Sequence, residues 1–290
     1  MIVQVLKSIP ALIKYKVSIA VTFTAITGFI VFSGKLDLSA FKLAFAVFVL
    51  ASGSSALNEL QEWKFDALMG RTKHRPIPSG KISRTTALLI SFLFIVAGLV
   101  LLFSGFGLIP ALLGLFNIFW YNLLYTNLKR VTSFAVVPGS LVGVVPVFIG
   151  WTAAGGNLFS STIIFIGFFL FIWQIPHFWL LMLKYGKEYE EAGFPTVNQS
   201  FNPKSLRNII FSWIVATTFS AILIPLFLVK LSWTFLIIIF VLNILFITIF
   251  TKLSFGKEAQ LNFKKSFISI NIYMMLFMIL LIVFHLYSIS

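Results

Sequence analysis

Apolar residues run in long stretches along this chain, and short polar connections separate them. A helix needs about 20 mostly apolar residues to cross the hydrocarbon core of a bilayer. By that criterion the sequence predicts about nine membrane-spanning helices, at residues 15–33, 40–57, 85–104, 107–126, 132–152, 158–181, 208–228, 231–250 and 267–288. We therefore expect an all-α polytopic membrane protein in which residues 1–290 form a single transmembrane domain.

The composition agrees with a membrane location. Hydrophobic residues make up 59% of the chain, charged residues make up 10%, and the mean hydropathy is +1.02. That leaves too little polar surface to cover a water-soluble globule. The first apolar run begins near Val17 and has no small-residue cleavage site after it, so we expect a retained helix rather than a signal peptide. The chain has no cysteine, which excludes disulfides, thiolate metal sites and covalent haem attachment.

The basic residues predict an orientation. If the N-terminus is cytoplasmic, all of the Lys and Arg residues except Lys35, Lys42 and Lys230 fall in cytoplasmic segments, as the positive-inside rule requires. We therefore expect an N-in, C-out protein of the plasma membrane with its active site on the cytoplasmic side. The net charge of +14 does not indicate nucleic acid binding, because the cations lie at helix ends. We interpret the isolated lysines of the N-terminus and the last loop as contacts to anionic lipid headgroups.

Carboxylates and cations gather after the second predicted span. Residues four apart share one helical face, so Asn58, Glu62 and Asp66 should present three oxygen ligands in a stripe. Mg²⁺ prefers such hard oxygen donors, usually with substrate phosphates and water. The cations Arg71, Lys73 and Arg75 follow at once, and this combination is suited to a metal-bridged diphosphate. The alternative is an ordinary interfacial helix with ion pairs.

Two further segments end predicted spans on the same side. Tyr125 and Lys129 share a helical face, and Arg130 follows; they either contact a diphosphate or anchor the helix at the interface. His177, set among tryptophans, could be a haem ligand, an acid–base group or a packed side chain. Glu188 is a candidate ligand for a second Mg²⁺, and Glu191, one turn on, is a weaker one.

Together these strings resemble the UbiA superfamily of intramembrane prenyltransferases, and within it the protoheme IX farnesyltransferases. The superfamily's Asn and two acids at four-residue steps match Asn58, Glu62 and Asp66. The haem-specific strings are matched by Asp66, Met69, Arg71, Thr72, Arg75 and Pro76, by the runs 125–130, 150–153 and 176–179, and by Glu188, Tyr189 and 192–195. The chain departs from the family in lacking paired prolines before Gly150, in having Glu188 where Asp is common, and in lacking a Met-Leu-Pro run after Pro195.

The resemblance implies helices around a central cavity and a Mg²⁺-dependent transfer of farnesyl from farnesyl diphosphate to a vinyl group of haem B, giving haem O. It assigns Mg²⁺ to Asn58, Glu62, Asp66 and Glu188, and the diphosphate to Arg71, Lys73, Arg75, Lys129 and Arg130. It makes Asp66, Tyr125, Lys129 and His177 catalytic candidates, with His177 also the candidate for binding haem. We leave His285 a structural role.

Two alternatives remain at this point. A related enzyme could prenylate a quinone precursor, an aromatic acid or a chlorophyll-type alcohol, although the strings around Met69 and His177 favour haem. A transporter could also carry intramembrane charges, but here the charges gather at one face and no broken half-helices pair at mid-membrane. Besides the lipid bilayer, a haem A synthase or terminal oxidase is a possible protein partner.

Overall fold

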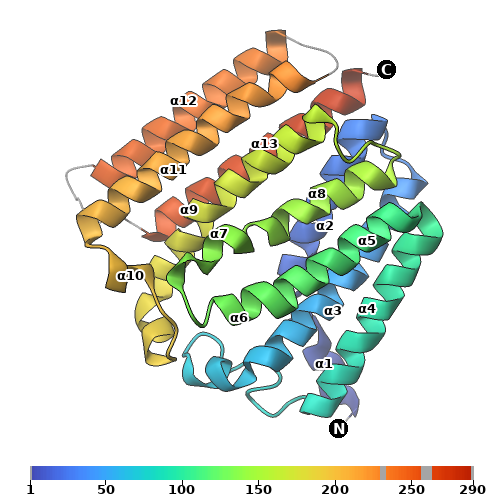
Figure 1. Cartoon of the computed structure of the whole chain (residues 1–290), viewed down its shortest axis with the longest axis vertical. Helices are drawn as coiled ribbons and strands as arrows, with labels where there is room; N and C mark the ends of the chain where they lie inside the picture. The colour runs from blue at the N-terminus through green and yellow to red at the C-terminus, as the bar shows by residue number, and fades with distance from the viewer. Residues whose placement is uncertain (1, 229–232, 256–262, 289–290) are drawn as a thin grey trace.

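The computed structural model describes residues 2–228, 233–255 and 263–288, and in these ranges the chain is helical, without β-strands (Figure 1). Nine helical stretches within the same ranges are long and apolar enough to cross a bilayer. The prediction of an all-α protein with about nine spans is confirmed, and the protein is a multi-pass integral membrane protein. Lys230 and residues 231–232, where the eighth span was predicted to begin, lie outside the described residues.

The spans follow one another in chain order after a short N-terminal helix. Their bounds are α1 (Ile2–Leu12), α2 (Tyr15–Ser33), α3 (Leu38–Leu68), α4 (Arg84–Phe106), α5 (Leu108–Ile118), η1 (Phe119–Tyr125), α6 (Thr126–Leu128), η2 (Ser133–Ala135), α7 (Val136–Gly139), α8 (Leu141–Ala153), α9 (Ser161–Glu191), α10 (Val197–Ser200), α11 (Pro203–Leu223), η3 (Ile224–Phe227), α12 (Trp233–Phe255) and α13 (Phe263–Ser288). Since α2 packs against α3, α8 and α13, the last span lies beside the first and the bundle closes on itself.

Several spans differ from their predicted lengths. Helices α3 and α9 continue beyond the predicted ends at 57 and 181, because carboxylates in their added turns bind the backbone of the connection that follows α3. The fourth span changes from α5 to the π-helix η1, and the fifth is divided into η2, α7 and α8. A π-helical turn inside a helix is rare and is frequent at functional sites, and apolar periodicity alone does not reveal it.

Helices α2 and α8 approach closely through two glycines. A Cβ placed on Gly150 would lie 1.7 Å from the carbonyl oxygen of Ala25, and one on Gly28 would lie 2.0 Å from that of Val147. Small residues let helix backbones meet in membranes, where lipid tails leave little hydrophobic drive for association. This contact therefore holds the first span directly against the fifth.

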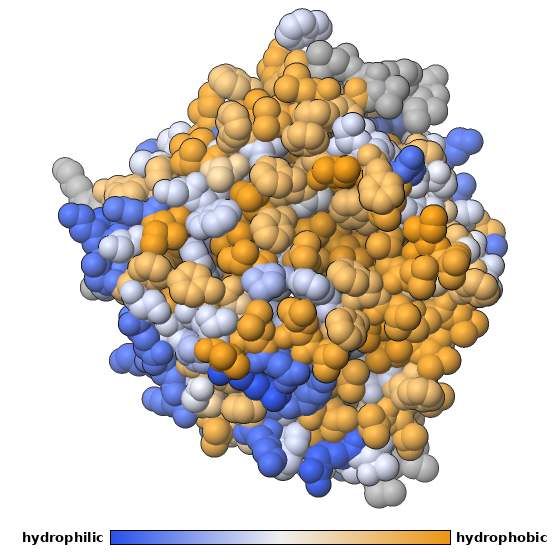
Figure 2. Space-filling model, viewed as in Figure 1, coloured by the Kyte–Doolittle hydropathy of each residue, from blue (hydrophilic) through white to orange (hydrophobic). Residues whose placement is uncertain are grey.

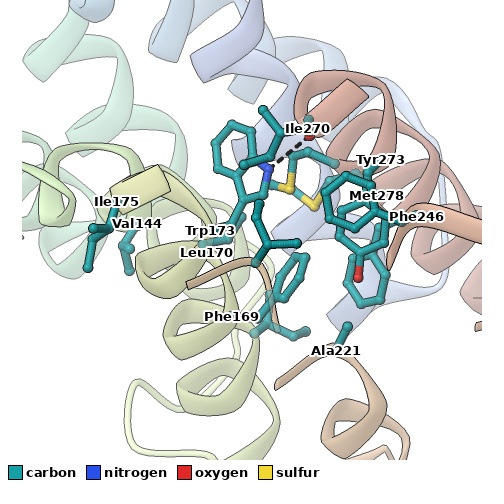
Figure 3. Close-up of a cluster of buried hydrophobic side chains, with 14 of the residues drawn as sticks. Val144, Phe169, Leu170, Trp173, Ile175, Ala221, Phe246, Ile270, Tyr273 and Met278 are labelled. Atoms are coloured by element: carbon teal, nitrogen blue, oxygen red, sulfur yellow. Dashed lines mark hydrogen bonds between the residues drawn. The ribbon is translucent and has the colours of Figure 1, made fainter. Parts of the chain in front are cut away.

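A second seam joins α9, α12 and α13 through aromatic side chains (Figure 3). The indole Nε1 of Trp173 donates to the carbonyl oxygen of Ile270 at 3.0 Å. The hydroxyl of Tyr273 donates to Asn243 Oδ1 at 2.8 Å, and its ring stacks on Phe246 at 4.1 Å between centroids. The polar tips of Trp173 and Tyr273 therefore both have a partner, which an apolar surrounding favours.

The outer surface separates by polarity along the helix axes. Apolar residues cover most of the visible face, and hydrophilic residues gather mainly along its lower left edge, where α3 and α9 end (Figure 2). Large apolar side chains such as Phe45, Phe92 and Phe240 are 61%, 62% and 56% exposed. Such a surface is suited to lipid tails rather than water.

We predict that Gly150→Leu lowers the midpoint of thermal denaturation in detergent, because its side chain cannot fit against Ala25. Overpacking of this kind costs about 1–3 kcal/mol. The matched control is Gly105→Leu, since a Cβ at Gly105 has nothing within 4 Å. Equal midpoints for the two variants would show that the α2–α8 approach does not limit stability.

Candidate active site

A cavity of about 320 Å³ lies inside the bundle and reaches its charged end. Its inner part is lined by apolar groups that include Val21, Val47, Leu50, Ile149 and Phe178. Its outer part is lined by polar and charged groups, namely Lys14, Asn58, Glu62, Asp66, Arg71, Arg75 and Lys129. Its volume lies in the range of small-molecule sites, and the arrangement is suited to a molecule with a charged head and an apolar body.

The stripe predicted on α3 exists. Asn58, Glu62 and Asp66 all line the cavity from one face of the helix, and they are only 1%, 6% and 1% exposed. Buried ionisable groups need partners, since an isolated charge is costly away from water.

Each member of the stripe holds one cation from a different part of the chain. Lys14 Nζ, from the junction of α1 and α2, donates to Asn58 Oδ1 at 2.6 Å. Lys129 Nζ, just after α6, lies 2.5 Å from Glu62 Oε1. Arg75 Nη1, from the connection after α3, lies 2.7 Å from Asp66 Oδ2. The outer end of the cavity is therefore a row of three oxygen–cation pairs, each made of one oxygen from the stripe and one cation from another segment.

Burial and nearby charges shift the pKa values of the three cations. Burial opposes the charge of Lys129, but the Glu62 carboxylate outweighs it and raises the pKa of that ammonium group. In the same way the Asp66 carboxylate raises the pKa of Arg75 despite its burial. For Lys14 the loss of water dominates, aided by repulsion from Arg75, and lowers its pKa to about 8. Lys129 and Arg75 thus stay cationic at neutral pH.

Sequence reasoning missed Lys14, which we had interpreted as a lipid contact. Its backbone is left-handed, with φ 47° and ψ 52°, a conformation that costs energy for a residue with a side chain. The turn ends α1 and directs the ammonium group to Asn58. A possible signal was the position of Lys14 at a helix junction directly before an apolar span.

The connection after α3 forms a roof over the charged end of the cavity. The backbone N–H of Arg71 donates to Glu188 Oε2 at 2.9 Å, and its guanidinium group lies 4.9 Å from the ring centroid of Tyr185. Farther along, the N–H of Ile77 donates to Glu59 Oε1 at 3.0 Å. Glu59 and Glu188 therefore fasten this connection to α3 and α9.

Tyr125 forms part of the wall beside Lys129. The ammonium group of Lys129 lies 5.2 Å from the Tyr125 ring centroid, so the predicted common face is observed. The ring also packs near Phe178 at 6.3 Å between centroids, and a Cβ on Gly139 would come within 2.5 Å of it. Tyr121, which sequence reasoning did not single out, lines the same cavity, and so does Tyr189, which the sequence analysis named only as part of a family string.

Four predicted site residues are not among those lining the cavity. Glu188 binds the backbone of Arg71 as described, and Lys73 is exposed. Arg130 donates to the carbonyl oxygen of Gln61 at 2.9 Å and stacks over Phe65. The ring of His177 packs against Trp173 and Phe267, at 4.8 and 4.9 Å between centroids. Haem binding by His177 would therefore require a site outside this cavity.

The donor set suits a metal that shares its coordination with substrate. Within the described residues, no group of three or more His, Asp or Glu side chains could hold an ion. The stripe instead offers one amide oxygen and two carboxylates, and Mg²⁺ commonly takes one or two carboxylates with phosphate oxygens and water.

The model of the UbiA prenyltransferase family matches residues 19–272 of this chain. The chain belongs to this family. Among curated proteins, it is 39% identical over 62% of its length to a protoheme IX farnesyltransferase of Geobacter sulfurreducens, covering 67% of that protein. It is 35% identical to the protein of the same name from Neorickettsia sennetsu, over 82% of this chain and 80% of that one. Within the UbiA family, the chain thus belongs with the protoheme IX farnesyltransferases, which makes it a prenyltransferase.

Solved UbiA structures share the fold at lower identity. A digeranylgeranylglyceryl phosphate synthase structure is 19% identical, with a TM-score of 0.78 over 97% of this chain and 98% of that one. A UbiA homologue from Archaeoglobus fulgidus, bound to GPP and Mg²⁺, is 14% identical, with a TM-score of 0.73 over 96% and 99%. The family's helical bundle is therefore the architecture of this chain.

We predict that Lys129→Met lowers both thermal stability and prenyl transfer, because it leaves the Glu62 carboxylate buried without its cation. Breaking a buried pair by removing one partner costs about 3–5 kcal/mol. The double variant Glu62→Gln/Lys129→Met should regain most of the melting temperature but not the activity. Thermal denaturation in detergent and product formation measure the two effects; additive losses of stability would contradict the pairing.

Proposed function

We propose that this protein transfers the farnesyl group of farnesyl diphosphate to a vinyl group of haem B and so makes haem O. The observation that carries the proposal is a row of oxygen–cation pairs at the mouth of a mostly apolar cavity. The pairs are Asn58–Lys14, Glu62–Lys129 and Asp66–Arg75. The names of the sequence relatives support haem as the acceptor and farnesyl as the donor group.

Asn58, Glu62 and Asp66 would hold Mg²⁺ together with oxygens of the diphosphate, and Glu188 lies at the roof as a further candidate ligand. Bound there, Mg²⁺ would neutralise the charge that develops on the leaving diphosphate. The A. fulgidus homologue bound to GPP and Mg²⁺ supports this choice of metal.

The cations of the row would exchange partners when substrate binds. Arg75 and Lys129, released from Asp66 and Glu62, would turn to the diphosphate oxygens, and Arg71 would join them from the roof. Fixed cations at the place where negative charge develops are commonly a large catalytic contribution. Because the raised pKa values of Arg75 and Lys129 keep both side chains cationic at neutral pH, neither has to gain a proton to receive the diphosphate. Lys73 and Arg130, on the outside of the cavity, would contribute only to the general positive field.

The inner cavity would protect the allylic cation that ionisation creates. Its lining is mostly apolar, with Ser54, Asn117 and Gln174 as polar contributions, and limits access of water to the cation. The faces of Tyr121, Tyr125 and Phe178 can stabilise a positive charge. The ring of Tyr125 lies 5.2 Å from the Lys129 ammonium group, and its hydroxyl could donate to a diphosphate oxygen held there.

The orientation is part of the proposal. With the N-terminus inside, the charged mouth would face the cytoplasm, the source of a water-soluble prenyl diphosphate, while haem and product would enter and leave through lipid. A haem A synthase or terminal oxidase in the same membrane could then take up the product.

The decisive test uses purified protein in detergent with haem B, farnesyl diphosphate and Mg²⁺. We expect a more hydrophobic haem by chromatography and mass spectrometry, with release of pyrophosphate and loss of activity in EDTA. Asp66→Asn should reduce turnover by about 10²–10³-fold, the scale of removing one electrostatic catalytic group. Asp37→Asn is the matched control, because Asp37 caps the far end of the same helix and Asn caps equally well. Prenylated haem formed at the normal rate by Asp66→Asn would contradict the site.

The orientation can be tested with two matched variants, because the natural chain has no cysteine. Lys35→Cys and Lys81→Cys each replace an exposed lysine, and the two lysines lie in the connections at opposite ends of α3. A membrane-impermeant maleimide should label Lys35→Cys in intact cells and Lys81→Cys only in inverted vesicles. The reverse pattern would place the active site outside.

A further inference from the structure

A second, smaller pocket lies against the charged end of the main cavity. Its volume is about 50 Å³, against about 320 Å³ for the cavity. The two share lining residues that include Tyr125, Lys129, Phe178 and Tyr189, so these side chains form a common wall. One water occupies roughly 10–15 Å³ on such a measure, so this side pocket has room for a few waters and not for a prenyl group or a haem.

The side pocket lies between the start of the fifth span and the connection after α9. Thr132, Ala135 and Val136 line it from the turn before η2, from η2 and from α7, and Pro195 lines it from the connection after α9. None of these four residues lines the main cavity. Tyr125, Lys129, Thr132 and Tyr189 are the lining residues with polar side chains, and they offer water the polar partners that a hydrated pocket requires.

The proposed reaction makes contradictory demands on water. An allylic cation next to bulk water would be hydrolysed, so the main cavity must stay dry. Haem O, the product of the proposed reaction, carries a hydroxyethylfarnesyl group and therefore contains one added water. That water must reach a carbon two bonds beyond C1 of the farnesyl group. That carbon lies near the diphosphate and therefore near Lys129, at the end of the cavity where the side pocket lies.

We propose that the side pocket holds the water that becomes the hydroxyl group of the product. The vinyl π electrons form a bond to farnesyl C1 as the C1–O bond breaks and its electron pair leaves with the diphosphate. The vinyl carbon next to the macrocycle becomes electron-deficient, and the water oxygen adds to it past the wall formed by Tyr125 and Tyr189. The proton of that water passes to the departing diphosphate. This inference rests on the proposed function.

The same intermediate has a competing outcome that makes the side pocket testable. If no water is at hand, the electron-deficient intermediate loses a proton from a neighbouring carbon and gives an alkene that is one water lighter. The ratio of hydrated to dehydrated product therefore reports the supply of water, independently of how fast farnesyl diphosphate is consumed.

The experiment fills the side pocket from a position outside the main cavity. Ala135 is 2% exposed, and Ala135→Val and Ala135→Leu add graded bulk there. We expect the hydrated-to-dehydrated product ratio, measured by mass spectrometry, to fall by about tenfold in Ala135→Leu, equivalent to about 1.4 kcal/mol between the competing barriers. The matched control is Ala51→Val, which adds bulk to the main cavity only and should leave the ratio unchanged even if turnover falls.

If the wild type makes hydroxylated prenyl haem and Ala135→Val and Ala135→Leu keep its product ratio while remaining folded, the side pocket assignment is wrong and the proposed function stands. If the wild type makes no prenylated haem, the proposed function itself fails. If Ala135→Leu does not fold, the product ratio is measured on Ala135→Val and Thr132→Val, and it should fall in both. Thr132→Ser keeps the hydroxyl group and should give the wild-type ratio.

Discussion

The pairing of each oxygen ligand with its own cation is the interaction on which the charged end of this protein depends. Glu62 and Asp66 lie inside a membrane protein, where an unpaired carboxylate would be costly. Lys129 and Arg75 remove that cost in the ligand-free protein. In the proposed reaction, a Mg²⁺–diphosphate complex would bring both a cation for the carboxylates and an anion for the released cations, so it could replace both ion pairs at once. The site would then be stable when empty and complementary to the proposed substrate.

The pairs also explain how the fold is assembled around the cavity. Lys14 reaches the stripe from the N-terminal junction, Arg75 from the roof and Lys129 from the end of the fourth span. Segments that lie before α3, directly after it and more than 60 residues beyond it are thus fixed to one face of this helix. The close approach of α2 and α8 at Gly28 and Gly150 holds the first span against the fifth. The apolar interior between these contacts is where the prenyl chain would lie.

Much of this was predictable from sequence, because its physical basis is local. Hydrophobic length gave the nine spans, and four-residue spacing placed Asn58, Glu62 and Asp66 on one helical face. The misses have long-range causes. The left-handed turn that directs Lys14 to Asn58, the π-helix that carries Tyr125, and the turning of Arg130 toward the Gln61 carbonyl all depend on contacts between distant segments. Residue type alone also did not show that His177 packs toward α13 instead of the cavity.

The most direct test of the central claim is a crystal structure of the full chain with Mn²⁺ in place of Mg²⁺ and with pyrophosphate, examined by anomalous scattering from the manganese. The account predicts a manganese peak bonded to the carboxylates of Glu62 and Asp66, with Arg75 and Lys129 turned from those carboxylates to the pyrophosphate oxygens. A manganese peak elsewhere, with both ion pairs intact, would contradict it.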